Sequence, residues 1–423
     1  LRTYDHIHEG NALRMDWREV LPPSDNVRVM GNPPFVGFTY MTQTQKADMK
    51  LIFPKKKNLD YVSCWYKKAY EYIKGTDIAV AFVSTNSITQ GETVGRMWEE
   101  IPVSINFAHK SFIWDSESTD KAHVHCVIIG FAEKAAVVKY LFNGNGLQRV
   151  KHINKYLCDA PDILVQSRMK PFYDVPSMVY GNKPADGGNL IIETEDYNDF
   201  VTREPLAKKY VRPLVGAKEF LHGTKRYCLW LVGGTPTELK KMPLVYARVQ
   251  ACREMRLSSV AEAIRKFADV PTRFAQVTQP EGADYLLVPC TSSEKRRYIP
   301  IGFMEKNTIV TNAVQIVPNA TLYTFGILTS NVHMAWMRMV AGRLKSDYRY
   351  ARDIVYNNFP WCDPTPEQKA AIEQTAQEIL DARAAEPESS LADLYDDVTM
   401  PPRLREAHRA NDRAVMRAYG FST

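Results

Sequence analysis

The feature that most restricts the fold is the alternation of short β-branched runs with amphipathic segments over residues 1–145. Between two such runs, Val62, Trp65, Tyr66, Ala69 and Ile73 recur at helical spacing, and Gly75 follows as a stop signal. Alternating strands and helices are typical of an α/β fold, here with a largely parallel sheet. The predicted strands cover residues 5–8, 27–30, 78–83, 104–108, 123–131 and 137–141.

Composition places the chain among core-forming globular proteins. It has 423 residues, of which 45% are hydrophobic and 24% charged, enough for two or three domains. No run approaches the roughly 18 apolar residues that cross a bilayer. The opening LRTYDHIHEGN lacks the basic start and apolar segment of a signal peptide. We therefore expect a cytoplasmic protein and, because the chain begins with Leu1 rather than Met, a fragment of a longer one.

The seven cysteines are scattered and never form a C-x-x-C pair. That spacing is expected of zinc and redox sites. We predict reduced thiols, mostly buried, and no metal site.

The formal charge of +6 is unevenly distributed along the chain. Residues 206–310 hold 18 Lys and Arg against 9 Asp and Glu, a net charge of +9, whereas residues 362–423 hold 7 against 12, a net charge of −5. A concentrated positive field is expected of a nucleic-acid-binding surface. A solvated basic face without such a role is the alternative.

Turn-forming residues divide the chain into four parts. NGNG at 143–146 and PADGGN at 184–189 suggest a connector over 146–205, after a first domain over 1–145. A second α/β domain is predicted over 206–361, with a helix at 246–267. The last part, 362–423, is a small helical subdomain: Thr365 and Pro366 open a helix whose apolar stripe is Ile372, Ala376, Ile379 and Leu380.

Asn32, Pro33, Pro34 and Phe35 form the motif most suggestive of chemistry. They follow the predicted strand 27–30, and open α/β sheets place their ligands at the carboxyl ends of strands. The Asn32 side-chain oxygen and the Pro33 carbonyl can accept hydrogen bonds from an exocyclic amine. The prolines stiffen the loop, and the Phe35 ring can stack on a base taken out of a duplex. An ordinary proline-rich turn is the alternative interpretation.

This motif resembles motif IV of the amino-group DNA methyltransferases, and His6 to Leu13 resembles their motif III. The resemblance implies that Asn11, where many relatives carry Asp, and Ala12 bind the adenine of S-adenosylmethionine. It also implies that the cofactor's glycine loop lies upstream, so this chain would hold an incomplete cofactor site and be inactive alone. The G-x-G at Gly144 to Gly146 is predicted to be a turn.

Two further segments resemble parts of the same catalytic domain. Residues 82–92 resemble the next strand and helix, which implies that Ser84 to Ser87 line the rim of the active site. Residues 108–114 resemble motif VIII, which implies that Phe112 or Trp114 stacks on the flipped base. Packing of both rings in a core at a strand end is the alternative.

The second half resembles the MmeI-like, type IIL restriction–modification enzymes, and the likeness covers nearly the whole chain. It implies a partial Rossmann-like class I sheet of a gamma-class, adenine-specific methyltransferase, followed by an α/β target-recognition domain and the helical subdomain. The partners implied are double-stranded DNA and an upstream segment of the same polypeptide with the nuclease and the other half of the cofactor site. The resembling segments are residues 251–256, 298–303, 342–350 and 354–360.

Lys345, Asp347 and Arg349 alternate, so on an extended strand they would project to one side. Lys and Arg donate to guanine in the major groove, and Asp accepts from cytosine. The resemblance implies that Lys345 and Asp347 specify one base pair beside the target adenine, and Ala313 with Arg349 another. A local salt bridge on a solvated strand is the alternative.

Other basic residues are predicted to contact DNA phosphates, which position a duplex without reading its sequence. They are Arg253, Arg256, Arg273, Lys295, Arg296 and Arg297.

The function expected from the resemblance is site-specific adenine-N6 methylation of duplex DNA with S-adenosylmethionine. Two alternatives stay open at this point. The chain could be a sequence-specific DNA-binding module without activity of its own, or an amine methyltransferase that acts on RNA or protein.

Overall fold

The structure is a computed structural model that describes residues 7–56, 58–114, 124–144 and 146–422. The chain folds as two compact units: unit 1 is formed by residues 1–168 and 339–346, and unit 2 by 169–338 and 347–423. None of the helices in the described residues is both long and apolar enough to cross a membrane.

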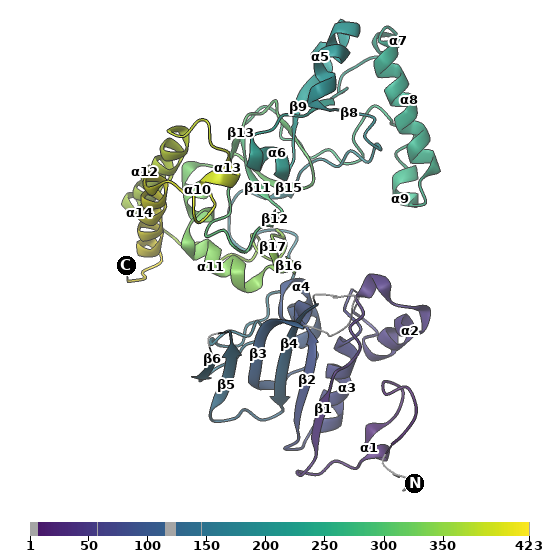
Figure 1. Cartoon of the computed structure of the whole chain (residues 1–423), viewed down its shortest axis with the longest axis vertical. Coiled ribbons are helices and arrows are strands. Elements are labelled where there is room, and N and C mark those ends of the chain that lie inside the picture. Colours follow the sequence, from purple (N-terminus) through teal and green to yellow (C-terminus); the bar gives the residue numbers. More distant parts are fainter. Residues whose placement is uncertain (1–6, 57, 115–123, 145, 423) are drawn as a thin grey trace. The chain divides into compact units, whose positions relative to one another are not determined.

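Unit 1 is built on a six-stranded sheet (Figure 1). In spatial order its strands are β1 (Arg28–Gly31), β2 (Ala79–Thr85), β4 (Val124–Ala132), β3 (Ser104–Trp114), β5 (Lys139–Asn143) and β6 (Gly146–Val150). The predicted α/β class is confirmed, but the sheet is mixed rather than largely parallel, because β4 runs antiparallel to both β2 and β3. Parallel neighbours need a crossover of about a dozen residues or more, and only residues 115–123 separate β3 from β4.

Most predicted strands of this sheet lie within two residues of the observed ones, except that β3 extends to Trp114. Of the predicted strand 5–8, residues 5 and 6 lie outside the described residues, and Ile7 and His8 are not in a strand. Asn143 pairs with Gly146 across β5 and β6, and Gly144 lies in a turn after β5, as predicted.

Helix α3 packs an aromatic cluster against the sheet. The predicted helix is confirmed over Ser63–Ile73, and Gly75 follows with a φ of 79°. The buried Tyr66 ring stacks on Phe131 at 5.5 Å and meets Phe82 edge-on at 5.3 Å. The other helices of residues 7–168 are α1 (Trp17–Val20), η1 (Phe38–Tyr40), α2 (Gln43–Ile52), η2 (Asn86–Thr89) and α4 (Gly91–Trp98).

A segment distant in sequence completes unit 1. Strand β16 (Gly342–Leu344) lies against the start of α4, where a Cβ on Gly91 would come within 3.2 Å of the Gly342 backbone. Gly91 also has a φ of 57°, so glycine is required there for both reasons.

Unit 2 contains two four-stranded sheets and a short strand pair (Figure 1). Residues 146–205, predicted as a connector, contribute β6 to unit 1 and two strands and a helix to unit 2. One sheet is β14 (Ile309–Val310), β9 (Val211–Val215), β10 (Tyr227–Leu229) and β8 (Ile191–Ile192), and the other is β13 (Gly302–Met304), β11 (Tyr285–Pro289), β15 (Val314–Pro318) and β7 (Val179–Tyr180). Strand β12 (Thr291–Ser292) pairs antiparallel with β17 (Asp347–Arg349).

The predicted helix 246–267 is wrong as a single element. The structure has α8 (Pro243–Ser258) and then α9 (Glu262–Arg265). Ser259 adopts an extended conformation and ends α8, and the Arg265 guanidinium donates to the carbonyls of Ser259 and Val260 between the two helices. Before α8, unit 2 also contains the helices α5 (Thr194–Arg203), η3 (Pro205–Tyr210), α6 (Ala217–His222) and α7 (Pro236–Lys240).

The C-terminal part is helical, as predicted. Thr365 caps α12 (Pro366–Ala384) through a capping box with Gln368, and Ile372, Ala376 and Ile379 are buried. The remaining helices are α10 (Leu322–Leu328), α11 (Asn331–Val340), α13 (Leu391–Leu394) and α14 (Pro402–Ala418).

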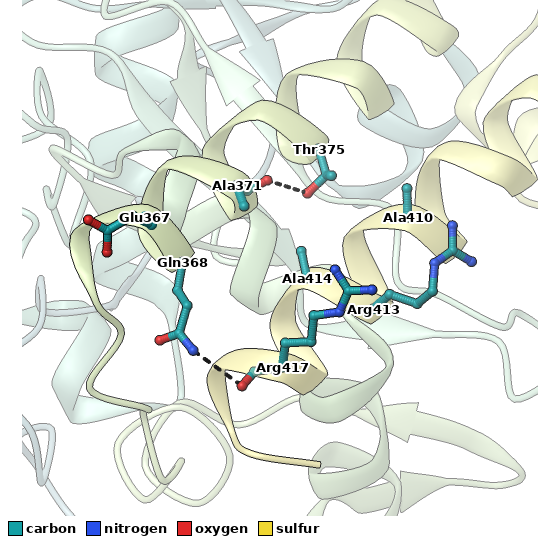
Figure 2. Close-up of a pocket in the computed structure, with 8 residues that line it drawn as sticks. All are labelled: Glu367, Gln368, Ala371, Thr375, Ala410, Arg413, Ala414 and Arg417. Atoms are coloured by element: carbon teal, nitrogen blue, oxygen red, sulfur yellow. Dashed lines mark hydrogen bonds between the residues drawn. The ribbon is translucent and has the colours of Figure 1, made fainter. Parts of the chain in front are cut away.

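A hollow of about 420 Å³ lies between α12 and α14, and the residues that line it include the small side chains of Ala371, Ala410 and Ala414 (Figure 2). At its edge the Gln368 amide donates to the Arg417 carbonyl. None of the predicted site residues lines this hollow.

The predicted contact between Arg256 and a DNA phosphate is wrong. Its side chain is fully buried, at 0% exposure. All five of its guanidinium N–H groups are engaged, since it donates to the carbonyl oxygens of Pro184, Ala185, Phe267, Val270 and Arg273 over 2.7–3.0 Å. A phosphate cannot reach this group. Arg256 therefore ties α8 to two loops and does not contact DNA.

We predict that Arg256→Lys destabilises the protein by about 2–4 kcal/mol, because an ammonium group cannot satisfy five divergent buried carbonyls. Urea unfolding measures the change. Arg253→Lys, on the exposed side of the same helix, should stay within about 0.5 kcal/mol of the wild type. Unchanged stability together with a weaker salt dependence of DNA binding would instead restore Arg256 as a phosphate contact.

Candidate active site and nucleic-acid interface

The loop Asn32 to Phe35 begins where β1 ends. β1 and β2 run parallel, with Gly31 opposite Phe82, so the loop leaves the sheet beside the last residues of β2. Asn32 and Pro34 are exposed, Pro33 is buried and Phe35 is half-buried. The predicted position at a carboxyl strand edge is confirmed, and Pro33 anchors a loop whose Asn32 amide faces outward.

Three hydrogen bonds fix the chain just after this loop. The Tyr61 amide donates to the Val36 carbonyl at 2.9 Å. The Phe38 amide donates to one carboxylate oxygen of Asp60 at 3.2 Å, and the Ser87 hydroxyl donates to the other at 2.6 Å. Sequence reasoning missed Asp60, because an acidic residue shortly before a helix is ordinarily explained as part of the helix start.

The rim predicted from Ser84 to Ser87 needs one correction. Ser84 is fully buried, and its hydroxyl is hydrogen-bonded to that of Tyr66 at 2.7 Å. Its side chain points into the core because residues alternate along β2. Thr85, Asn86 and Ser87 are half-buried and remain at the end of the strand.

Phe112 and Trp114 lie at the same edge of the sheet as Asn32, since β3 runs antiparallel to β4, which runs antiparallel to β2. The two rings are neighbours, with centroids 6.3 Å apart, and Trp114 is 40% exposed. Phe112 also packs against His109 at 4.8 Å. Three strand spacings, about 14 Å, separate the backbones of β1 and β3, a gap that a planar base and the side chains beside it can bridge.

Asn11 and Ala12, the predicted cofactor residues, lie in a turn. The Asn11 amide donates to Asp48 at 3.1 Å and accepts from the Leu13 amide at 3.0 Å, so its side chain faces the protein. Ala12 lines a cavity of about 410 Å³ whose walls include Met15, Trp17 and Val29. Its carbonyl accepts from the Trp17 indole at 2.8 Å.

The predicted alternation through Lys345, Asp347 and Arg349 is only partly correct. Asp347 and Arg349 lie on β17 on either side of the buried Tyr348, so both face away from the core. Lys345 instead lies in the two-residue turn between β16 and β17, with a φ of 56°. A strand cannot continue through that left-handed conformation.

Ala313 and Arg349 are brought close together by a shared neighbour. The Cys290 amide donates to the Ala313 carbonyl at 3.1 Å, and the Cys290 carbonyl accepts from the Tyr350 amide at 2.8 Å. Ala313 is exposed. The base-reading candidates Ala313, Asp347 and Arg349 therefore lie on adjoining segments of unit 2.

The basic candidates for phosphate contacts differ in exposure. Arg253, Arg273, Lys295 and Arg297 are exposed, and the Arg297 guanidinium lies 5.6 Å from the Tyr298 ring centroid. Arg296 is half-buried; burial lowers the pKa of its guanidinium, and the charges of Asp347 and Asp396 oppose that effect. Arg296 thus lies near a predicted base-reading residue.

The cysteines are free thiols, and four of the seven are buried. Burial raises the pKa of Cys64 to about 12, and the Asp48 charge adds to this effect. Within the part of the chain that the structure describes, no group of three or more His, Cys, Asp or Glu side chains is arranged to hold a metal ion.

Three family models match the chain: MmeI, DNA-methyltransferase domain over residues 1–143; MmeI, target recognition domain over 159–363; and MmeI, C-terminal domain over 364–423. DNA methyltransferase A of Bacillus subtilis (strain 168) is 40% identical over 428 residues, which cover 99% of this chain and 48% of that protein.

The solved structure of the type IIL restriction–modification enzyme MmeI in complex with DNA is 45% identical and superposes with a TM-score of 0.92. The match covers 100% of this chain and 58% of that one, so the chain spans about half the length of these two relatives. The resemblance predicted from the sequence is confirmed. The chain belongs to the MmeI family, and it carries that family's DNA-methyltransferase, target recognition and C-terminal domains.

Proposed function

We propose that this chain methylates adenine N6 in duplex DNA at a specific sequence, as part of a restriction–modification polypeptide. The observation that carries the proposal is the loop Asn32 to Phe35, which leaves the end of β1 with Asn32 exposed and Pro33 buried. The amine lone pair of adenine is delocalised into the ring. The Asn32 oxygen and the Pro33 carbonyl can hold that amine in a reactive orientation, while the Phe35 ring stacks on the flipped base.

S-adenosylmethionine supplies an electrophilic methyl group when bound. Ala12 and the apolar wall of its cavity suit one side of a purine ring, and Asn11 holds this turn in place through Asp48. Phe112 or Trp114 would close the opposite side of the target base. Asn11 and Ala12 would thus form part of the cofactor site.

The remaining part of that site belongs, in this proposal, to an upstream segment of the same polypeptide, which would also carry the nuclease. Strand β1 is the last strand on its side of the sheet among the described residues, and Met30 on it is 80% exposed. Its outer edge is suited to pairing with one more strand.

Asp347 and Arg349 of unit 2, together with Ala313, would read base pairs in the major groove. Lys345, which precedes Asp347 by two residues in the chain, would act with it. Arg253, Arg273, Lys295, Arg296 and Arg297 would position the duplex through phosphates. The net positive charge of residues 206–310 favours duplex DNA over a short peptide as substrate.

The first prediction concerns the amine-binding loop. In the full-length polypeptide, Asn32→Ala should slow methyl transfer on the order of 100-fold or more, because one of two acceptors for the amine is lost, while duplex binding is retained. Transfer of labelled methyl groups to a duplex library, with mass spectrometry of the nucleosides, measures this. Asn26→Ala, an exposed residue before β1, is the matched control and should be neutral. Label on cytosine, RNA or protein in place of adenine N6 contradicts the proposal.

The second prediction concerns sequence readout. Lys345→Glu combined with Asp347→Arg should change the base at one position of the methylated motif, because the donor and the acceptor exchange places. Methylome sequencing of a host that expresses the full-length variant reads the motif directly. Arg297→Ala should leave the motif unchanged and lower the salt dependence of DNA binding by about one unit of slope. An unchanged motif in the double variant would contradict base reading by Lys345 and Asp347.

A further inference from the structure

Two consecutive residues, Asp60 and Tyr61, connect three segments of unit 1 that are distant in sequence. They lie in the loop between α2 and α3, and neither belongs to the motifs identified from the sequence. Asp60 holds other parts of unit 1 through its carboxylate, and Tyr61 does so through its backbone amide and its hydroxyl. The contacts divide into two branches.

The Asp60 branch joins the amine-binding loop to the end of β2. One carboxylate oxygen accepts from the Phe38 amide at 3.2 Å, three residues after Phe35, and the other accepts from the Ser87 hydroxyl at 2.6 Å. Ser87 is also hydrogen-bonded to the Thr85 hydroxyl at 3.0 Å. Hydrogen bonds to an ionised carboxylate are stronger than those between neutral groups, so Asp60 limits the motion of both segments.

The Tyr61 branch joins the same loop to the turn that carries Asn11. The Tyr61 amide donates to the Val36 carbonyl at 2.9 Å, and its hydroxyl donates to Asp48 at 2.7 Å. Asp48 is 1% exposed and also accepts from Asn11 and, at 2.7 Å, from Arg14.

The pKa of Asp48 is consistent with an ionised carboxylate that its hydrogen-bond donors stabilise. Burial on its own would raise the pKa of Asp48, but the hydrogen bonds from Tyr61, Arg14 and Asn11 outweigh burial and lower it. Burial and the neighbouring Asp48 charge together raise the pKa of Tyr61, which keeps the phenol protonated as a donor.

We propose that Asp60 and Tyr61 are positioning residues: Asp60 sets the amine-binding loop against the end of β2, and the Tyr61 hydroxyl, through Asp48, sets the Asn11 turn that binds the cofactor. This rests on the function proposed above. The two side chains act on different partners, so their removal has different kinetic consequences.

The experiment uses the full-length polypeptide with Asp60→Ala, Asp60→Asn and Tyr61→Phe. Asp60→Ala should lower kcat for adenine methylation about 10- to 100-fold and leave the Kd for S-adenosylmethionine within about twofold, since the amine-binding loop and the end of β2 are released while the Asn11 turn keeps its hydrogen bonds to Asp48. Asp60→Asn should restore most of the rate, because its oxygen can accept from Phe38 and its amide can donate to Ser87.

Tyr61→Phe should have the complementary effect. It removes one donor to Asp48 and should raise the Kd for S-adenosylmethionine, measured by calorimetry without DNA, about 3- to 10-fold, with kcat at saturating cofactor within about twofold. Tyr66→Phe is the matched control, because it removes a buried tyrosine hydroxyl bonded to Ser84 over the same 2.7 Å, on the adjoining helix. It should change neither the Kd nor kcat.

The outcomes separate the two proposals. If the wild-type polypeptide methylates adenine and the Asp60 and Tyr61 variants lose kcat and cofactor affinity equally, or no more than Tyr66→Phe does, the positioning roles are wrong and the proposed function stands. If Asp60→Asn is as slow as Asp60→Ala, the hydrogen-bonding role of Asp60 is wrong. A wild-type polypeptide that methylates no adenine overturns both.

Discussion

The parallel pairing of β1 with β2 is the constraint on which the catalytic unit depends. With Gly31 opposite Phe82, both strands end at one edge of the sheet, so the Asn32 loop and the residues after Ser84 leave it side by side. The antiparallel β4 and β3 then bring Phe112 to the same edge. A slip of one residue between β1 and β2 would reverse the faces of every side chain on β1 and move Asn32 away from its neighbours.

Backbone pairing places these segments but does not fix the loops that follow them. Those loops are fixed by a few hydrogen bonds from the loop between α2 and α3, whose Tyr61 ring meets Trp65 of α3 edge-on at 5.0 Å. Helix α3 in turn packs on the sheet through Tyr66. A rigid core thus supports a site made of loops, the usual division between scaffold and functional groups. The Asp60 carboxylate is hydrogen-bonded to Phe38, just after the Asn32 loop, and to Ser87, just after β2. Its side chain therefore joins two loops that the pairing of the strands does not connect.

The sequence was sufficient for features that depend on local pattern. The helix around Tyr66, the capping box at Thr365 and the position of Asn32 after a strand follow from residue spacing and are as predicted. The sequence was insufficient where the role of a residue depends on partners that are distant in the sequence. Arg256 looks like any surface arginine of a basic region, yet five carbonyls from two remote loops enclose it. The residues next to Asp60 in the sequence do not indicate that Phe38 and Ser87 are its hydrogen-bond partners.

Lys345 belongs to the same class of failure, and its backbone conformation has a consequence for how the proposed base readout can vary. Its φ of 56° lies in the left-handed region, which a straight-chain residue tolerates at moderate cost and a β-branched residue hardly at all. Lys, Glu, Asn and Gly can therefore exchange at this turn, whereas Val, Ile and Thr would distort it. Asp347 lies on the regular strand β17, where its conformation sets no such restriction. In the proposed readout, the turn therefore restricts which residues can stand at position 345, whereas the strand places no such restriction on position 347.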